Sequence, residues 1–397
     1  MADALPLGSP QALQERGGWA NRDTAYRFAD YAEAVYGALG DRVTHWTTFN
    51  EPLCSSLIGY IGGEHAPGLT DPVAGLAAVH HQHLAHGLAV ERLRGLAAAA
   101  TDGTGAARDI RLGITLNLTN AVPNHPADPV DLEAARRIDA LWNRMFLDPM
   151  LRGAYPADLL EDVREFGLED HIHDGDLAHI AQPIDFLGVN HYHDDNVSGH
   201  PLPEDARPGL RPTDKPGRSP FPGSDYVTFP TRGLPRTAMD WEVNPSGLEK
   251  LLVRLGDEYP NLPPLYITEN GAAYDDVVSP DGQVHDVERT QYIVDHIAAV
   301  GRAIDAGADV RGYFVWSLLD NFEWAWGYEK RFGIVRVDYD TFERTPKDSA
   351  LAYAKLIAEH KASQDVAADV SADASAAASS TGGDARGQSE ASATIVG

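Results

Sequence analysis

Cysteine is nearly absent from this sequence, in which Cys54 is the single example among 397 residues. One cysteine excludes a disulfide framework within the chain and a metal cluster built from several thiolates. The N-terminal sequence MADALPLGSPQALQERGGW has no basic segment followed by an apolar one, so it contains no recognisable signal peptide. No segment is long and apolar enough to cross a bilayer. Together these absences predict a cytoplasmic protein.

Basic residues are also scarce, since 32 Lys and Arg stand against 59 Asp and Glu, which gives a formal net charge of -27. Charge of this sign repels nucleic acid and anionic membrane surfaces, so we expect neither as a partner. Its simplest role is to keep the protein soluble. A hydrophobic fraction of 43% is typical of globular proteins, and the length accommodates one α/β barrel or two ordinary domains. The sequence does not indicate an oligomeric state.

Two stretches differ in composition from the rest of the chain. Residues 362–397 are mostly Ala, Ser, Gly and Asp and contain no aromatic residue. Because such a segment has too little apolar surface to bury, we predict a disordered tail and a folded domain over residues 1–361. Residues 194–236 are rich in Pro and Gly. A long irregular segment inside a domain is typical of a lid, a rim or a specificity loop.

Apolar periodicity predicts five strands, each followed by a helix, with one more helix in front of the first strand. The predicted strands are 43–49, 111–118, 184–189, 265–268 and 310–318. The predicted helices are 21–39, 73–100, 129–146, 245–255, 287–306 and 346–360. In the first helix the side chains expected to face the core are Phe28, Tyr31, Ala32, Val35 and Leu39.

Strands that alternate with helices predict a parallel sheet, in either a β/α barrel or a doubly wound fold. No Gly-rich phosphate loop follows any of the strands, which disfavours the doubly wound nucleotide-binding alternative. A closed barrel has eight strands. The five predicted units therefore match the back part of a barrel.

Two of the predicted strands end in a glutamate beside polar residues, in the sequences TFNEP around Glu51 and ITENG around Glu269. The C-terminal ends of barrel strands build the active site, and two carboxylates there are what glycosidic bond hydrolysis requires. A single such glutamate is as readily a salt-bridge partner or a helix cap, so the pair carries the argument. Asn50 could bond a sugar hydroxyl, and Asn190 and Tyr192 could hold the attacking carboxylate. The sequence leaves retention and inversion open, because they depend on the carboxyl separation.

A third cluster, the sequence YFVWSLLDNFEWAWGY over residues 313–328, places Trp316, Trp324 and Trp326 around Glu323. Aromatic faces can stack on the C–H face of a sugar, although an aromatic core segment has the same composition. A glutamate between aromatic residues is costly to bury without a partner, which favours a ligand site.

The motifs TFNEP, ITENG, RGGW, HAPG and VWSLLDNFEWAWGY closely resemble family 1 glycoside hydrolases, the family of bacterial β-glucosidases, over residues 10–359. The resemblance implies a (β/α)8 TIM barrel, of which the chain holds about the last five β/α units. It implies a retaining β-glucosidase without cofactor or metal, acting on cellobiose, cello-oligosaccharides and aryl or alkyl β-glucosides. β-Galactosidase or β-fucosidase activity is the alternative within the family.

The resemblance also assigns roles to individual residues. Glu51 is implied to be the acid/base on the fourth strand of the barrel, and Glu269 the nucleophile on the seventh. The implied substrate contacts are Asn50 at the 2-hydroxyl, Asn190 and Tyr192 near the carboxylates, Trp316 as the sugar platform, and Glu323 and Trp324 at the outer hydroxyls. Because the charge of Glu323 would repel a phosphate group, we expect unphosphorylated sugars.

The chain departs from the family at its start, where residues 1–9 stand in place of a strand that carries His-Trp-Asp in full-length members. The first three strands of the family, and a Gln that holds glucose hydroxyls, have no counterpart. Three explanations fit the sequence: a misplaced start or interrupted gene, an inactive remnant that binds sugar or has no function, and completion by another chain.

Some residues that could have a catalytic or metal-binding role are expected to have a structural one. His80, His81, His83 and His86 share a predicted helix, but no acidic or cysteine ligand lies near them in the sequence, so we expect barrel-helix histidines and no zinc site. Cys54 is expected to be a small buried filler. Asp320 and Arg331 are expected to be structural or orienting residues.

Overall fold

A computed structural model describes residues 2–3, 9–100, 108–202 and 218–362. Its centre is a six-stranded sheet, parallel throughout, with the strand order β1-β2-β3-β5-β7-β8. These strands are β1 (Ala2–Asp3), β2 (His45–Asn50), β3 (Arg111–Asn117), β5 (Phe186–Asn190), β7 (Leu265–Asn270) and β8 (Val310–Val315). Two small two-stranded sheets pair β4 (Ala121–Pro123) with β6 (Asp195–Val197), and β9 (Val335–Val337) with β10 (Arg344–Pro346).

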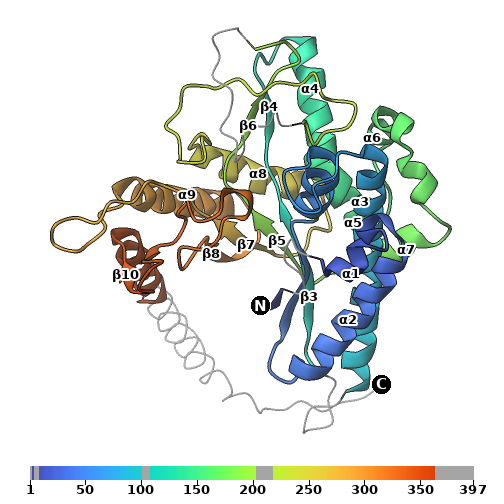
Figure 1. The fold of residues 1–397 in the computed structure, drawn as a ribbon, viewed down its shortest axis with the longest axis horizontal. Coiled ribbons are helices and arrows are strands. Elements are labelled where there is room, and N and C mark those ends of the chain that lie inside the picture. Colours follow the sequence, from blue (N-terminus) through green and yellow to red (C-terminus); the bar gives the residue numbers. More distant parts are fainter. Residues whose placement is uncertain (1, 4–8, 101–107, 203–217, 363–397) are drawn as a thin grey trace, which may run out of the picture.

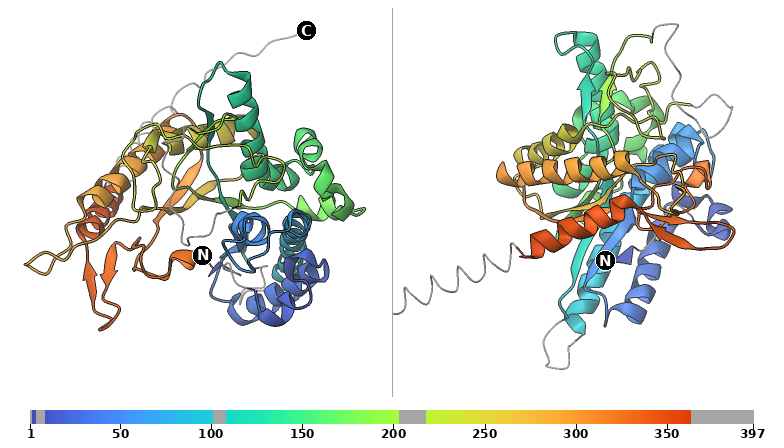
Figure 2. Two further views of the ribbon diagram at one scale, coloured as in Figure 1. Left: turned by 45° about the horizontal axis from the view of Figure 1, so that its top comes forward. Right: turned by 90° about the vertical axis from the view of Figure 1, so that its left-hand side faces the viewer.

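Helices follow the strands and cover the outside of the sheet (Figure 1). They are α1 (Gln11–Gln14), α2 (Asp23–Leu39), α3 (Pro72–Ala99), α4 (Pro129–Asp139), α5 (Met145–Leu151), α6 (Ala157–Asp162), α7 (Asp176–Ile180), α8 (Pro245–Glu258), α9 (Val287–Asp305) and a helix over 348–362. Helices α2 and α3 pack together beside β2 and β3, and α8 and α9 pack together on the other side of the molecule (Figures 1 and 2).

The middle strands β2, β3 and β5 are buried along most of their length, as parallel strands usually are, whereas β8 exposes Arg311 and Phe314. All five residues of β5 are buried, and β3 buries Leu112, Ile114 and Leu116. These apolar side chains belong to one continuous core that also takes in the inner faces of the surrounding helices. The core therefore fixes the positions of the strand ends, where the polar residues lie.

Two helices begin with the same dipeptide, Asp-Pro. The side chain of Asp71 accepts hydrogen bonds from the backbone N–H groups of Val73 and Ala74, and Asp128 accepts one from Val130. In each case proline follows at the first helical position, where its missing N–H costs nothing.

The structure confirms the five predicted strands and the helices around them, with ends that differ by a few residues. The predicted helix 129–146 is wrong in detail, because a π-helical turn at Ala140–Arg144 separates α4 from α5. This turn lets Trp142 Nε1 donate to the carbonyl of Asn117, and Asn143 Nδ2 to that of Thr119. The irregular turn thus places two side chains that donate hydrogen bonds to the backbone at and just after the end of β3.

The core face of α2 also differs from the prediction. Tyr31 and Leu39 are 46% and 38% exposed, whereas Tyr36 is buried against Trp46. Helix α3 packs along α2 and thereby sets which of its faces is covered. The predicted disordered tail lies outside the described residues from 363 onward, and Ala362, the last described residue before it, is helical.

The predicted irregular stretch 194–236 contains the short strand β6 and, where it is described, extended segments and turns. Its part over 203–217 lies outside the described residues. Within the described ranges no helix has both the length and the apolar character of a membrane span.

A buried network of charges joins the segments that follow β7 and β8. The Lys347 ammonium group is fully buried and donates to the carboxylates of Asp276 and Asp320. Arg289 pairs with Asp276, and Arg331 pairs with Asp320. This contact agrees with the structural role predicted for Asp320 and Arg331, since the network ties the strand-end loops to the last helix.

We predict that Lys347→Met lowers the free energy of unfolding by about 3–5 kcal/mol, because two buried carboxylates lose a shared cation. Urea denaturation followed by circular dichroism measures this change. Lys355→Met is the matched control, since the side chain of Lys355 is 76% exposed. Equal denaturation midpoints for the two variants would contradict the stabilising role of the network.

Candidate active site

A cavity of about 410 Å³ opens where β2, β5 and β7 end. The structure brings all eight predicted site residues into its lining: Asn50, Glu51, Asn190, Tyr192, Glu269, Trp316, Glu323 and Trp324. They come from four separate segments of the chain. Parallel strands place their carboxyl ends on one edge of a sheet, which explains how such distant residues meet.

The pairing of the strands becomes irregular at the residues that carry the polar side chains. The register shifts between Thr47 and Asn50 on β2, between Val189 and Asn190 on β5, and after Ile267 on β7. Such irregularities bend a strand and re-aim its side chains, and they are common beside active sites. Glu51 itself has a φ of 51°, in the left-handed region that only a few non-glycine residues adopt. The backbone therefore departs from regular strand geometry at the residues where we expect the reaction to occur.

The amide of Asn190 bridges two strand ends. Its Nδ2 donates to Glu51 Oε1 at 2.8 Å and to Asn50 Oδ1 at 2.9 Å, while its Oδ1 accepts from Thr268 Oγ1 at 2.6 Å. Asn190 is completely buried, so none of these groups can turn to bulk water instead. This single side chain sets the distance between the ends of β2 and β7.

The second carboxylate is held by a tyrosine. The hydroxyl of Tyr192 donates to Glu269 Oε2 at 2.5 Å, a short bond typical of an ionised acceptor. The next residues of the strand pass close to another backbone segment, because a Cβ on Gly271 would lie 1.8 Å from the carbonyl oxygen of Trp316. Only glycine fits there, which gives a physical reason for the glycine in the sequence ITENG.

The pKa values of both carboxyl groups are raised. Burial raises the pKa of Glu51, against the hydrogen bonds from Asn190 and Cys54. Burial, followed by repulsion from Glu51, raises the pKa of Glu269 well above its usual range, while Tyr192 and Asn190 oppose that rise. Burial and mutual repulsion both favour the protonated form of a carboxyl group, so the pair resists carrying two negative charges at once. Such a pair is suited to one acidic and one basic role.

A third acid borders the cavity among tryptophans. Burial, and secondly repulsion from Glu51, raises the pKa of Glu323 to about 7, so near neutral pH its carboxyl can donate or accept a hydrogen bond. Its Oε2 is buried, and no described residue bonds to it. Trp316 and Trp324 line the cavity with it. Aromatic faces beside polar groups suit a sugar ring.

The sequence did not indicate several residues that also line the cavity. Cys54 is buried in the core, as predicted, and its thiol also donates to Glu51 Oε2 at 3.2 Å, a contact that the prediction did not include. Its position three residues after Glu51 could have signalled this contact. The other such lining residues include Trp142, His193, Asp195, Phe221 and Trp241. Trp142 lies in the π-helical turn before α5 and Asp195 begins the short strand β6, while the other three lie in irregular segments.

The four histidines of α3 are all buried. His80 Nε2 lies 2.9 Å from Asp176, His83 Nδ1 lies 2.9 Å from the hydroxyl of Tyr155, and His86 Nδ1 lies 2.7 Å from Thr48. Burial lowers the pKa of His86 to about 4, so this ring is neutral at physiological pH. These contacts fit the structural role that we predicted for the histidines.

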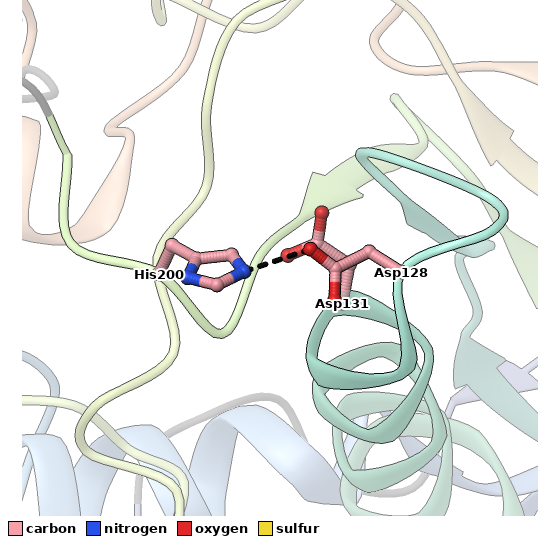
Figure 3. Close-up of side chains that lie close together, drawn as sticks. All are labelled: Asp128, Asp131 and His200. Atoms are coloured by element: carbon pink, nitrogen blue, oxygen red, sulfur yellow. Dashed lines mark hydrogen bonds and ion pairs between the residues drawn. The ribbon is translucent and has the colours of Figure 1, made fainter.

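Among the described residues, one group brings potential metal-ligand atoms together, and it consists of Asp128, Asp131 and His200 (Figure 3). Asp131 already accepts hydrogen bonds from Ser198 and from the backbone N–H groups of Gly199 and His125. Asp128 caps α4 and accepts from His200. These bonds fasten the segment after β6 to α4, so we assign the group a structural role.

Two carboxyl groups that share a cavity at the ends of parallel strands, beside aromatic side chains, match the arrangement that glycosidases use. Residues 7–362 match the model of glycosyl hydrolase family 1, and this chain belongs to that family. Its fold is accordingly that of the family's (β/α)8 barrel, whose parallel sheet the described strands represent.

Named relatives agree with the family. The chain is 45% identical to the bifunctional β-D-glucosidase/β-D-fucosidase of Bifidobacterium breve, over 90% of this chain and 74% of that protein. It is 42% identical to β-glucosidase A of Thermotoga maritima, over 88% of this chain and 71% of that protein. The crystal structure of the psychrophilic β-glucosidase BglU from Micrococcus antarcticus matches with a TM-score of 0.86 and 67% identity, over 90% of this chain and 74% of that one.

We predict that Tyr192→Phe raises the pKa of Glu269 further, because the hydroxyl that stabilises the carboxylate is lost. Titration of the protein with ¹³C-labelled glutamate carboxyls, followed by NMR, measures the pKa, and Glu269→Gln assigns the signal. Tyr31→Phe on the exposed face of α2 is the matched control. A titration curve for Glu269 that is the same in Tyr192→Phe and in the unaltered protein would contradict the role of this hydrogen bond.

Proposed function

We propose that this chain is a retaining β-glucosidase that hydrolyses terminal, non-reducing β-D-glucosyl residues, with Glu51 as acid/base and Glu269 as nucleophile. The observation that carries the proposal is the single cavity that the carboxyl groups of Glu51 and Glu269 share. The names of the B. breve, T. maritima and M. antarcticus relatives support a glucoside as substrate.

The first step forms a glycosyl-enzyme ester. Glu51 gives its proton to the glycosidic oxygen, whose bond to the anomeric carbon breaks, while an oxygen of Glu269 attacks that carbon. In the second step Glu51 takes a proton from water, whose oxygen attacks the anomeric carbon and releases Glu269 as carboxylate. Tyr192 holds Glu269 in line for attack, and Asn190 orients Glu51.

The remaining predicted residues supply contacts to the sugar. In this proposal Asn50 bonds the 2-hydroxyl, Trp316 stacks on the ring, and Glu323 and Trp324 bind the outer hydroxyls. In its ionised form the carboxyl of Glu323 repels a phosphate group, which favours unphosphorylated glucosides. The B. breve relative is named for both glucoside and fucoside hydrolysis, so a β-fucosidase or β-galactosidase activity is the second candidate.

The proposal includes a place for the described strands in the barrel. We infer that β2, β3, β5, β7 and β8 are its last five strands, within a catalytic unit over residues 1–361. This numbering puts Glu51 directly after the fourth strand and Glu269 near the end of the seventh, close to the places that the resemblance to the family implies. Among the described residues, no hydrogen-bonded pairing joins β8 to β1.

We predict that purified residues 1–397 hydrolyse 4-nitrophenyl β-D-glucoside and that Glu269→Gln lowers kcat by about 10⁴-fold or more, because the nucleophile is lost. A 2-fluoroglucosyl fluoride should label Glu269, as mass spectrometry of peptides can test. Glu288→Gln on the exposed side of α9 is the matched control. Absence of both hydrolysis and labelling would favour an inactive remnant.

The acid/base assignment has its own test. In Glu51→Gln, kcat/KM for an alkyl β-glucoside should fall by about 10²–10⁴-fold, because its leaving group needs a proton. A 2,4-dinitrophenyl β-glucoside needs no such proton, so its kcat/KM should change little.

The pH profile of the dinitrophenyl substrate gives a second result for Glu51→Gln. Removing the charge of Glu51 lowers the pKa of Glu269, so the carboxylate of Glu269 forms at lower pH. The acid limb of the kcat/KM profile should therefore shift to lower pH. An equal loss for both substrates, with an unmoved acid limb, would contradict the assignment.

A further inference from the structure

A layer of polar side chains lies behind the strand end that carries Glu269, and the mechanism above does not use it. Asn270, the residue after Glu269, is completely buried and does not line the cavity. Tyr292 of α9 and Tyr313 of β8 do not line the cavity either. These three side chains bond to one another where α9 packs on the sheet.

The amide of Asn270 joins three parts of the chain. Its Nδ2 donates to the carbonyl of His191 at 2.6 Å, in the segment after β5, and to the hydroxyl of Tyr292 at 3.1 Å. Its Oδ1 accepts from the hydroxyl of Tyr313 at 2.6 Å. Because both the nitrogen and the oxygen of this amide have partners inside the protein, its orientation is fixed.

Tyr292 extends this network to the residue that bonds the nucleophile. Its hydroxyl donates to the backbone carbonyl of Tyr192 at 2.8 Å. The side chain of Tyr292 is buried and stacks on His296, with 3.8 Å between the ring centroids. One helical turn earlier, the buried Arg289 donates from Nε to the carbonyl of Ala272, in the loop after β7. Helix α9 is thus fastened to the strand end, so the hydroxyl of Tyr292 is held in one place.

Tyr192 is consequently anchored at two points. Its hydroxyl donates to Glu269 Oε2 at 2.5 Å, and its carbonyl accepts from Tyr292. The backbone N–H of the preceding residue, His191, donates to the carbonyl of Glu269 at 2.9 Å. The side chain that bonds the nucleophile therefore depends for its position on a hydroxyl group outside the cavity.

We propose that Tyr292 is a positioning residue for the nucleophile Glu269. Its hydroxyl holds the backbone of Tyr192, so that the hydroxyl of Tyr192 stays on the carboxylate. The inference rests on the function proposed above, and Tyr292 itself touches neither the substrate nor the carboxyl pair. Without its hydroxyl the buried carbonyl of Tyr192 loses its donor, and the backbone has to shift to find another. Because attack requires close alignment with the anomeric carbon, a small displacement of Tyr192 lowers the rate.

Tyr292→Phe removes the hydroxyl and keeps the ring. The informative substrate is 2,4-dinitrophenyl β-glucoside, whose leaving group needs no proton, so its kcat/KM reports on attack by Glu269. We expect kcat/KM to fall about tenfold, because the nucleophile is less well aligned. The acid limb of the pH profile should shift to higher pH, since a weaker bond from Tyr192 raises the pKa of Glu269.

A double variant shows whether Tyr292 acts through Tyr192. In a Tyr192→Phe background, adding Tyr292→Phe should lower kcat/KM by less than about twofold, because the bond to Glu269 is already absent. Tyr259→Phe is the matched control, since this buried tyrosine at the end of α8 donates to Asp148 at 2.6 Å and neither residue lines the cavity. The control should leave the acid limb unmoved.

Thermal unfolding followed by circular dichroism shows whether each variant is folded at the assay temperature. Tyr313→Phe is a second variant that releases the Asn270 amide on one side, so the acid limb should shift in the same direction. If Tyr292→Phe is not folded, the result for Tyr313→Phe decides. An unmoved acid limb in the folded variants overturns the inference, as does a further loss of the full size when Tyr292→Phe is added to Tyr192→Phe.

NMR titration of the labelled glutamate carboxyls separates this inference from the proposed function, because it needs no turnover. Tyr292→Phe should raise the pKa of Glu269 whether or not the protein hydrolyses a glucoside. An unaltered protein that neither hydrolyses the substrate nor is labelled at Glu269 contradicts the proposed function. An unchanged pKa of Glu269 in folded Tyr292→Phe contradicts the positioning role.

Discussion

Two carboxyl groups that repel each other have to remain together in a cavity with little water, and the rest of the site depends on how that repulsion is managed. The buried amide of Asn190 donates to Glu51 and accepts from the strand that carries Glu269. Tyr192 donates to Glu269 from the same segment of the chain. The two donors therefore stabilise negative charge on the carboxyl groups, while burial and mutual repulsion raise the pKa of both.

The parallel sheet brings the residues of the site together, because its strands end along one edge. Its strands bury apolar side chains such as Ile114, Val189 and Ile267, and β2, β5 and β7 carry polar side chains at their C-terminal ends, where the register also shifts. The apolar part supplies a rigid core, and the irregular ends direct side chains into one cavity. Behind the cavity, the buried charges around Lys347 tie together the loops after β7 and β8. The apolar core and the buried charges stabilise the fold, whereas the strand ends set the geometry of the site.

Much of this was predictable from the sequence, for identifiable reasons. Glutamates after apolar runs, as in TFNEP and ITENG, combine a local pattern with a fixed position at a strand end, so Glu51 and Glu269 could be found without coordinates. The burial of Cys54 was predicted, but its contact with Glu51 was not, because the side chain enters the site at the start of a π-helical turn. Trp142 was missed because the π-helical turn changes the direction of a predicted helix, and His193 and Asp195 were missed because they lie in a segment with no periodicity.

The sequence by itself determined the class of fold, the strands, the two carboxylates and the aromatic cluster after the last strand, since each is encoded by neighbouring residues. The tertiary structure alone decided that Asn190 joins two strand ends, that the helix over 129–146 changes to a π-helical turn at Ala140, and that Trp142 and Trp241 line the cavity of the carboxyl pair. These features arise from contacts between residues tens to hundreds of positions apart, and only the packing of the whole sheet brings such residues together.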